Sequence, residues 1–219
     1  MKNVTITVEE PVLEWVRVEA AKRNSSVSRL VGEMLADLFC TYAPGTAKRK
    51  DDLSRYAVAF GQGLQMTNIL KDIWEDRARG VSWMPRQEFA RLGVVMPDID
   101  PANQGPAMQQ AIRELVAVTH AQLGYAMEFT LAIAPGDTGI RKFCAWNIGM
   151  ALLTLRKIIA TPGYTSAAEV KISRTSVMWT MALTSAGIRS NTWLRFLFKR
   201  VASGLPQIVA TPAQAPLEA

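Results

Sequence analysis

A series of long segments with helical periodicity, separated by proline and glycine, constrains the fold most strongly. From Val31 onward no stretch of any length alternates polar and apolar residues as a half-buried strand would. The sequence therefore predicts an all-α domain of long helices joined by short loops. The expected helices cover residues 28–40, 48–79, 86–92, 107–133, 138–160, 173–186 and 190–203. Residues 204–219 are rich in proline and alanine, which indicates a loose tail.

Composition excludes several function classes. The 219 residues are 49% hydrophobic, so the chain can bury a core and is not disordered throughout. Cys40 and Cys144 are too few for a disulfide framework or a cysteine-rich metal site, and the single His120 argues against a catalytic triad. These features favour a cytoplasmic protein. The net charge of +6 permits an anionic partner without selecting one.

One predicted helix carries a stripe of oxygen-bearing side chains. Within Phe60–Gly80, the four residues of this stripe fall inside an arc of roughly 80°; they are Gln65, Asn68, Asp72 and Asp76. Two carboxylates one turn apart, beside apolar residues, need a positive partner. Such a set suits Mg²⁺, which takes one or two carboxylates and completes its shell with water and phosphate oxygens. A solvated acidic helix face is the alternative interpretation.

Four ordered motifs resemble the squalene/phytoene synthase family over about residues 31–200. They read GLQMTNILKDIWED, GVSWMP, FCAW followed by MALLTL, and EVKISR. The resemblance implies an isoprenoid-synthase helical bundle in which two aspartate-rich motifs face a central cavity. It further implies a Mg²⁺-dependent, head-to-head condensation of prenyl diphosphates, either farnesyl or geranylgeranyl. The products would be phytoene or, with NADPH as hydride donor, squalene; the EVKISR form favours the squalene branch.

The resemblance also assigns roles to individual residues. The matching metal ligands are Asn68, Asp72 and Asp76, and the matching substrate contacts are Gln65, Asn68, Lys71, Lys171 and Arg174. Phe143 matches an aromatic residue that lines the family's cavity near the developing cation. Asp72, Asp76 and Phe143 are thus the expected catalytic residues. Core packing is the alternative role for Phe143, and a solvated helix start is the alternative for Lys171 and Arg174.

The sequence departs from the family before its second aspartate-rich motif. No DxxxD pair precedes Asp72, and Asp51 and Asp52 are merely adjacent. We therefore expect residues 31–203 to form the C-terminal half of a synthase-like domain, with little or no activity by itself. The change of pattern near residues 28–32 predicts a junction, which a fusion, a rearranged gene or a sequence-assembly artefact would each explain.

Residues 1–30 show a different pattern. The segment 2–8 alternates like a strand, a helix follows Pro11, and a second helix runs from Ser25 or Ser26 to about residue 40. This order resembles ribbon-helix-helix DNA-binding domains of antitoxins and repressors, which pair two chains through their strands. The resemblance implies base contacts from Asn3, Thr5 and Thr7 and a phosphate contact at Ser25, and hence a homodimer and a DNA partner. An arm packed on the helical body is the alternative.

Positive charge concentrates near the other end of the sequence. Between Val170 and Leu217 there are six basic residues and no acidic one, whereas residues 1–30 carry a net charge of only +1. Weak charge is unusual for a DNA-binding segment. The distribution therefore favours diphosphate or an anionic membrane surface over nucleic acid, and it leaves peripheral membrane contact open.

Overall fold

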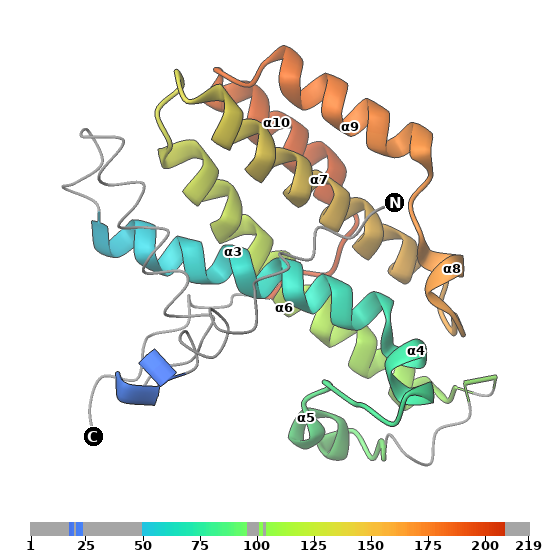
Figure 1. Ribbon diagram of the computed structural model, residues 1–219. Helices are drawn as coiled ribbons and strands as arrows, with labels where there is room; N and C mark the ends of the chain where they lie inside the picture. The colour runs from blue at the N-terminus through green and yellow to red at the C-terminus, as the bar shows by residue number, and fades with distance from the viewer. Residues whose placement is uncertain (1–17, 20, 24–49, 96–100, 103, 209–219) are drawn as a thin grey trace.

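The computed structural model describes residues 18–19, 21–23, 50–95, 101–102 and 104–208, apart from the side chains of 50–52 and 86–88. Every regular element in these residues is a helix (Figure 1). The strand expected at residues 2–8 lies outside the described part. So do the residues expected to contact DNA, which are Asn3, Thr5 and Thr7 in that strand and Ser25 at the start of the second helix. The described residues between Val18 and Lys22 are helical, and Arg23 Nε donates to Glu19 Oε1 over 2.9 Å.

Eight labelled helices follow one another from residue 50. They are α3 (Lys50–Lys71), α4 (Ile73–Ala78), α5 (Arg86–Arg91), α6 (Pro106–Ala132), α7 (Thr138–Ala160), α8 (Ala167–Val170), α9 (Arg174–Ala186) and α10 (Asn191–Ala202). The bounds confirm the expected all-α fold and the expected helices from residue 86 onward, to within one residue at either end. Two features were not expected: the segment 48–79 divides at Asp72, and the short α8 follows α7.

The three long helices form the centre of the domain. Helix α3 packs along α6, α7 contacts both, and α9 and α10 lie on the other side of α7 (Figure 1). Fully buried aliphatic side chains from α3, α6 and α7 fill the space between them, among them Leu70, Val116, Leu123, Ile148 and Leu155. A Cβ at Gly149 would lie 2.5 Å from Thr180 Cγ2, so a glycine there lets α9 approach the backbone of α7.

The first residues of the expected loose tail are packed against the body. Leu205 is buried in the main core, and His120 Nδ1 lies 2.9 Å from the Pro206 carbonyl oxygen. The His120 ring also stacks on Phe198 with 6.1 Å between centroids. The single histidine thus has a structural position, and the remainder of the tail, 209–219, lies outside the described residues.

A buried arginine connects the ends of three helices. Arg141 on α7 is 0% exposed. Its Nη1 donates to the carbonyls of Ile133 at 2.7 Å and Thr130 at 3.2 Å, at the C-terminal end of α6. Its Nε donates to the Ile188 carbonyl at 2.8 Å, and its Nη2 donates to Asn191 Oδ1 at 2.6 Å. Burial lowers the pKa of this guanidinium. Its partners are neutral oxygens rather than a carboxylate, and two of them are carbonyls at the negative end of α6.

Helix α7 is also the one described helix that is long and apolar enough to cross a membrane. It packs against α3, α6, α9 and α10, and its most apolar window is 44% buried inside the protein. A central core helix has the same length and composition, so this finding alone is weak evidence for a membrane span.

We expect Arg141→Met to lower the free energy of unfolding by roughly 3 kcal/mol or more, because each buried acceptor left without a donor costs about 1–3 kcal/mol. Arg141→Lys should recover only part of the loss, since an ammonium lacks the planar fork. Urea denaturation followed by circular dichroism measures both. Arg113→Ala, at an exposed site on α6, should stay within about 0.5 kcal/mol of the parent. Equal midpoints for Arg141→Met and the parent would contradict this role.

Candidate active site

The expected metal-binding residues lie where α3 passes into α4. Asp72 has φ −102° and ψ 16°, outside the α-helical region, so the structure interrupts the helix at this aspartate. The helical hydrogen bonds nevertheless continue across it: the Asp72 N–H donates to the Asn68 carbonyl and the Asp76 N–H to the Asp72 carbonyl, each at 2.9 Å. The two carboxylates therefore remain one turn apart on one side of the chain.

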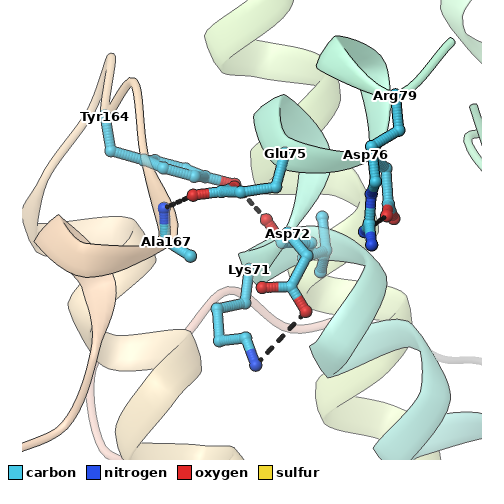
Figure 2. Close-up of polar contacts among 8 residues, drawn as sticks. Lys71, Asp72, Glu75, Asp76, Arg79, Tyr164 and Ala167 are labelled. Carbon is cyan, nitrogen blue, oxygen red and sulfur yellow. Dashed lines mark hydrogen bonds and ion pairs between the residues drawn. The ribbon is translucent and has the colours of Figure 1, made fainter. Parts of the chain in front are cut away.

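Each aspartate has its own cationic partner. Lys71 Nζ lies 3.3 Å from Asp72 Oδ2, and Arg79 Nη2 forms a close ion pair with Asp76 Oδ1. Figure 2 shows the Asp72 carboxylate turned toward Lys71 and the Asp76 carboxylate toward Arg79. Both aspartates are partly exposed, with side-chain accessibilities of 29% and 17%. The positive charge that these carboxylates require is thus supplied by the protein itself in this state.

The polar residues that precede the aspartates are open to solvent. Gln65 and Asn68 are exposed on α3, and neither side chain forms a hydrogen bond with another described residue. The described residues contain no cluster of three or more His, Cys, Asp or Glu that would form a complete metal cage. A stripe of two carboxylates and an amide still fits Mg²⁺, because this ion commonly takes few protein ligands and fills its shell with water and substrate phosphate.

A buried tyrosine anchors the aspartate-bearing segment. Tyr164, in the loop after α7, is 1% exposed, and its hydroxyl donates to the Leu70 carbonyl in the last turn of α3. The Tyr164 carbonyl in turn accepts from Trp74 Nε1 at 2.6 Å and from Gln104 Nε2 at 2.7 Å. Burial raises the pKa of Tyr164, and the charges of Glu75 and Asp72 act in the same direction. These bonds fix the position of α4 relative to α7.

A glutamate on α4 forms a hydrogen bond with the start of α8, just before the EVKISR motif that contains Lys171 and Arg174. Glu75 Oε1 accepts from the Ala167 N–H at 2.7 Å, at the start of α8, as Figure 2 shows. Its other oxygen, Oε2, is buried without a partner among the described residues. Lys171 follows α8 directly and Arg174 begins α9, and both side chains are exposed. The structure thereby joins the segment that precedes Lys171 and Arg174 to α4, the helix that follows Asp72 and contains Asp76.

Phe143 lies at a different level of the bundle. It is 49% exposed in an early turn of α7, and its neighbour Cys144 packs against Leu53 and Ala57 in the first turns of α3. From there to Asp72, α3 rises roughly 22–28 Å. The structure therefore does not bring Phe143 next to the aspartates.

The sequence pattern gives no sign of the anchoring residues Tyr164, Gln104 and Glu75. Tyr164 follows Pro162–Gly163, a turn in which Gly163 has φ +80°. A turn sequence of this kind does not indicate whether the tyrosine after it is buried or exposed. The hydrogen bond of Glu75 joins it to Ala167, 92 residues further along the chain, so helical periodicity within residues 60–80 does not reveal it.

A model of the squalene/phytoene synthase family matches residues 25–176. The chain belongs to this family. The match begins a few residues before the expected junction and includes the aspartate stripe, Phe143, Lys171 and Arg174. The helical architecture agrees with the all-α fold implied by the resemblance.

Individual relatives are distant. The chain is 27% identical over 117 residues to phytoene synthase 2 of Solanum lycopersicum, covering 53% of this chain and 36% of that protein. It is 28% identical over 125 residues to presqualene diphosphate synthase of Zymomonas mobilis, covering 57% of this chain and 42% of that protein. It is 29% identical over 133 residues to 15-cis-phytoene synthase of Enterobacter agglomerans, covering 60% of this chain and 40% of that protein. The chain thus matches less than half the length of these relatives.

We expect Tyr164→Phe to destabilise the protein by about 1–2 kcal/mol at neutral pH, because the Leu70 carbonyl loses a buried donor. The difference should narrow above about pH 10. There the unfolded parent ionises its tyrosine while the folded parent, whose pKa is raised, holds the proton, so the parent's stability falls with pH. Urea titrations across this range test the sign. The control is Tyr56→Phe, which keeps the ring that stacks on Tyr125. A difference that widens with pH would contradict this account.

Proposed function

We propose that this chain supplies one Mg²⁺- and diphosphate-binding wall of a head-to-head prenyl-diphosphate synthase. The observation that carries the proposal is the stripe of Asn68, Asp72 and Asp76 at the interrupted end of α3, within the segment that matches the family. Asp72 and Asp76 would be metal ligands, with Asn68 beside them. Mg²⁺, when bound, would supply positive charge to the departing diphosphate of a farnesyl or geranylgeranyl substrate.

The ion pairs in this segment support a coupled mode of binding. Lys71 and Arg79 now neutralise the two aspartates. When a divalent cation takes over the carboxylates, these two side chains become available to the phosphate oxygens, which carry the opposite charge. Metal and diphosphate would then bind most favourably together, because neither the cations nor the carboxylates are left without a partner.

The rest of the substrate would follow the length of α3. Lys171 and Arg174, on the segment that Glu75 docks against α4, would contact the diphosphate from the side of α8, and Gln65 would lie near it on α3. Phe143, on α7 and beside the Cys144 that packs on the first turns of α3, would line the path of the hydrocarbon chain rather than the diphosphate site.

Head-to-head condensation is the proposed reaction, without a choice between squalene and phytoene as the product. The interpretation that favoured the squalene branch, and with it NADPH, rests on the EVKISR motif alone. The relatives include both phytoene synthases and a presqualene diphosphate synthase. The DNA-binding alternative rests on Asn3, Thr5, Thr7 and Ser25, which lie outside the described residues, and no structural observation favours it.

We expect Asp72→Asn to weaken Mg²⁺-dependent binding of farnesyl diphosphate at least tenfold, because even residues that only support metal ligands contribute about 10–100-fold. Asp76→Asn should have a similar effect. Isothermal titration of the full chain with farnesyl diphosphate, with and without Mg²⁺, measures it. Asp137→Asn provides the control, since that aspartate precedes α7 and its side chain caps nothing. Unchanged binding in Asp72→Asn would refute the metal assignment.

We also expect the purified chain to form little or no squalene or phytoene from its prenyl diphosphate, Mg²⁺ and NADPH. No DxxxD pair precedes Asp72 in these 219 residues, so they supply only one of the two aspartate-rich motifs that the family resemblance implies. Co-expression with the aspartate-rich N-terminal half of a relative should restore product, and Asp72→Asn should abolish that restoration. Robust synthesis by the chain alone would overturn this part of the proposal.

A further inference from the structure

Helix α9 presents an apolar outer surface. Among its thirteen residues Thr184 alone is buried, and its charged residue, Arg174, stands at the first position. Met178 is 70% exposed and Trp179 is 63% exposed, and Met181 and Leu183 are exposed as well. A helix on the surface of a protein in water ordinarily places polar and charged side chains outward. The outer side of α9 is therefore suited to a partner that accepts apolar side chains.

An apolar hollow opens beside this surface. Helices α7, α9 and α10 enclose a cavity of about 310 Å³, which lies in the size range of pockets that hold small ligands. Its lining is mainly hydrophobic, with serine and threonine side chains contributed by α9 and the residue before it, and it includes Ile148, Leu152, Leu183, Leu197 and Phe198. Trp179 both lines the cavity and reaches solvent, so it marks the mouth.

The same hairpin of helices is positively charged. Apart from Arg174, which the proposed function assigns to the diphosphate, its exposed cations are Arg189, Lys199 and Arg200, and no acidic residue lies between 170 and 208. Arg195 does not belong to this set, because it forms a two-point ion pair with Glu128 on α6. On α10, Phe196 is 55% exposed and lies between these cations in sequence.

We propose that the outer surface of the α9–α10 hairpin docks on a bilayer that contains anionic phospholipids. Trp179 and Met178 would enter the interfacial region, where tryptophan is favoured, and the cations would meet the lipid phosphates. The hollow at Trp179 offers room for part of an acyl chain. A second copy of this chain fits the surface poorly, because an isologous contact would set these cations against the same cations of the other copy with no acidic residue between them. The proposal does not depend on the proposed synthase function.

Co-sedimentation of the full chain with vesicles tests this surface without any prenyl substrate. The chain should bind vesicles of phosphatidylglycerol and phosphatidylcholine in equal parts, bind phosphatidylcholine alone much less, and release with added salt. Trp179→Ser should reduce partitioning about tenfold. The matched control is Trp83→Ser: Trp83 is 64% exposed, like Trp179, but follows α4, and its replacement should leave partitioning unchanged.

Two further variants guard against loss of folding. Met178→Ser changes the most exposed apolar side chain of the surface and should reduce partitioning severalfold while the thermal midpoint stays at the parent's value. The pair Lys199→Gln and Arg200→Gln should reduce binding to anionic vesicles about fivefold for each charge. The proposal is overturned if the parent does not sediment with anionic vesicles, or if Trp83→Ser loses as much binding as Trp179→Ser. A concentration-dependent dimer that Met178→Ser dissociates would instead assign the surface to a second copy.

Discussion

The packing of the C-terminal half depends on one buried guanidinium. Arg141 is inserted from α7 into the end of α6, where it satisfies two carbonyls, and it also holds the turn between α9 and α10 through Ile188 and Asn191. Asn191 completes the arrangement by donating to the Leu131 carbonyl at 3.3 Å. A charge buried without a carboxylate is tolerable here because the end of a helix presents several oxygens that carry partial negative charge. Removing the charge would therefore release the α9–α10 hairpin as well as α6, since the same side chain bonds to both.

A second set of buried polar contacts gives the candidate active site its geometry. The Tyr164 hydroxyl and carbonyl connect the end of α3, Trp74 of α4 and Gln104 in one cluster, and Glu75 adds the bond to α8. These contacts explain how Asp72 can leave helical geometry without α4 losing its position: the segment on either side is held by residues distant in sequence. The aspartates thus lie at a local irregularity of the helix whose flanking residues are held by buried hydrogen bonds.

Sequence periodicity predicted the helices well because most of them pack one face on the core and end at proline or glycine. The helix expected at 138–160 agrees with α7, and those expected at 173–186 and 190–203 agree with α9 and α10 within one residue. The break at Asp72 and the anchors at Tyr164 and Glu75 were beyond such reasoning, since each depends on contacts across the fold. Arg141 did leave a signal, because it shares the helical spacing of the buried residues Ala145, Ile148 and Leu152. An arginine on an apolar stripe indicates a buried cation with specific acceptors.

The residue beside Phe143 has a consequence for the chemistry of the folded chain. Cys144 is 2% exposed among Leu53, Ala57, Phe129 and Ile133. Burial raises the pKa of its thiol to about 12, against the weaker opposing effects of a hydrogen bond with Thr130 and the nearby charge of Arg141. Alkylating reagents react with the thiolate form of cysteine. The Cys144 thiol, buried where α3, α6 and α7 meet, is therefore unreactive toward them at neutral pH as long as the chain stays folded. The rate at which Cys144 is alkylated therefore measures how often the contact between α3, α6 and α7 opens. Mass spectrometry distinguishes the Cys144 peptide from the Cys40 peptide.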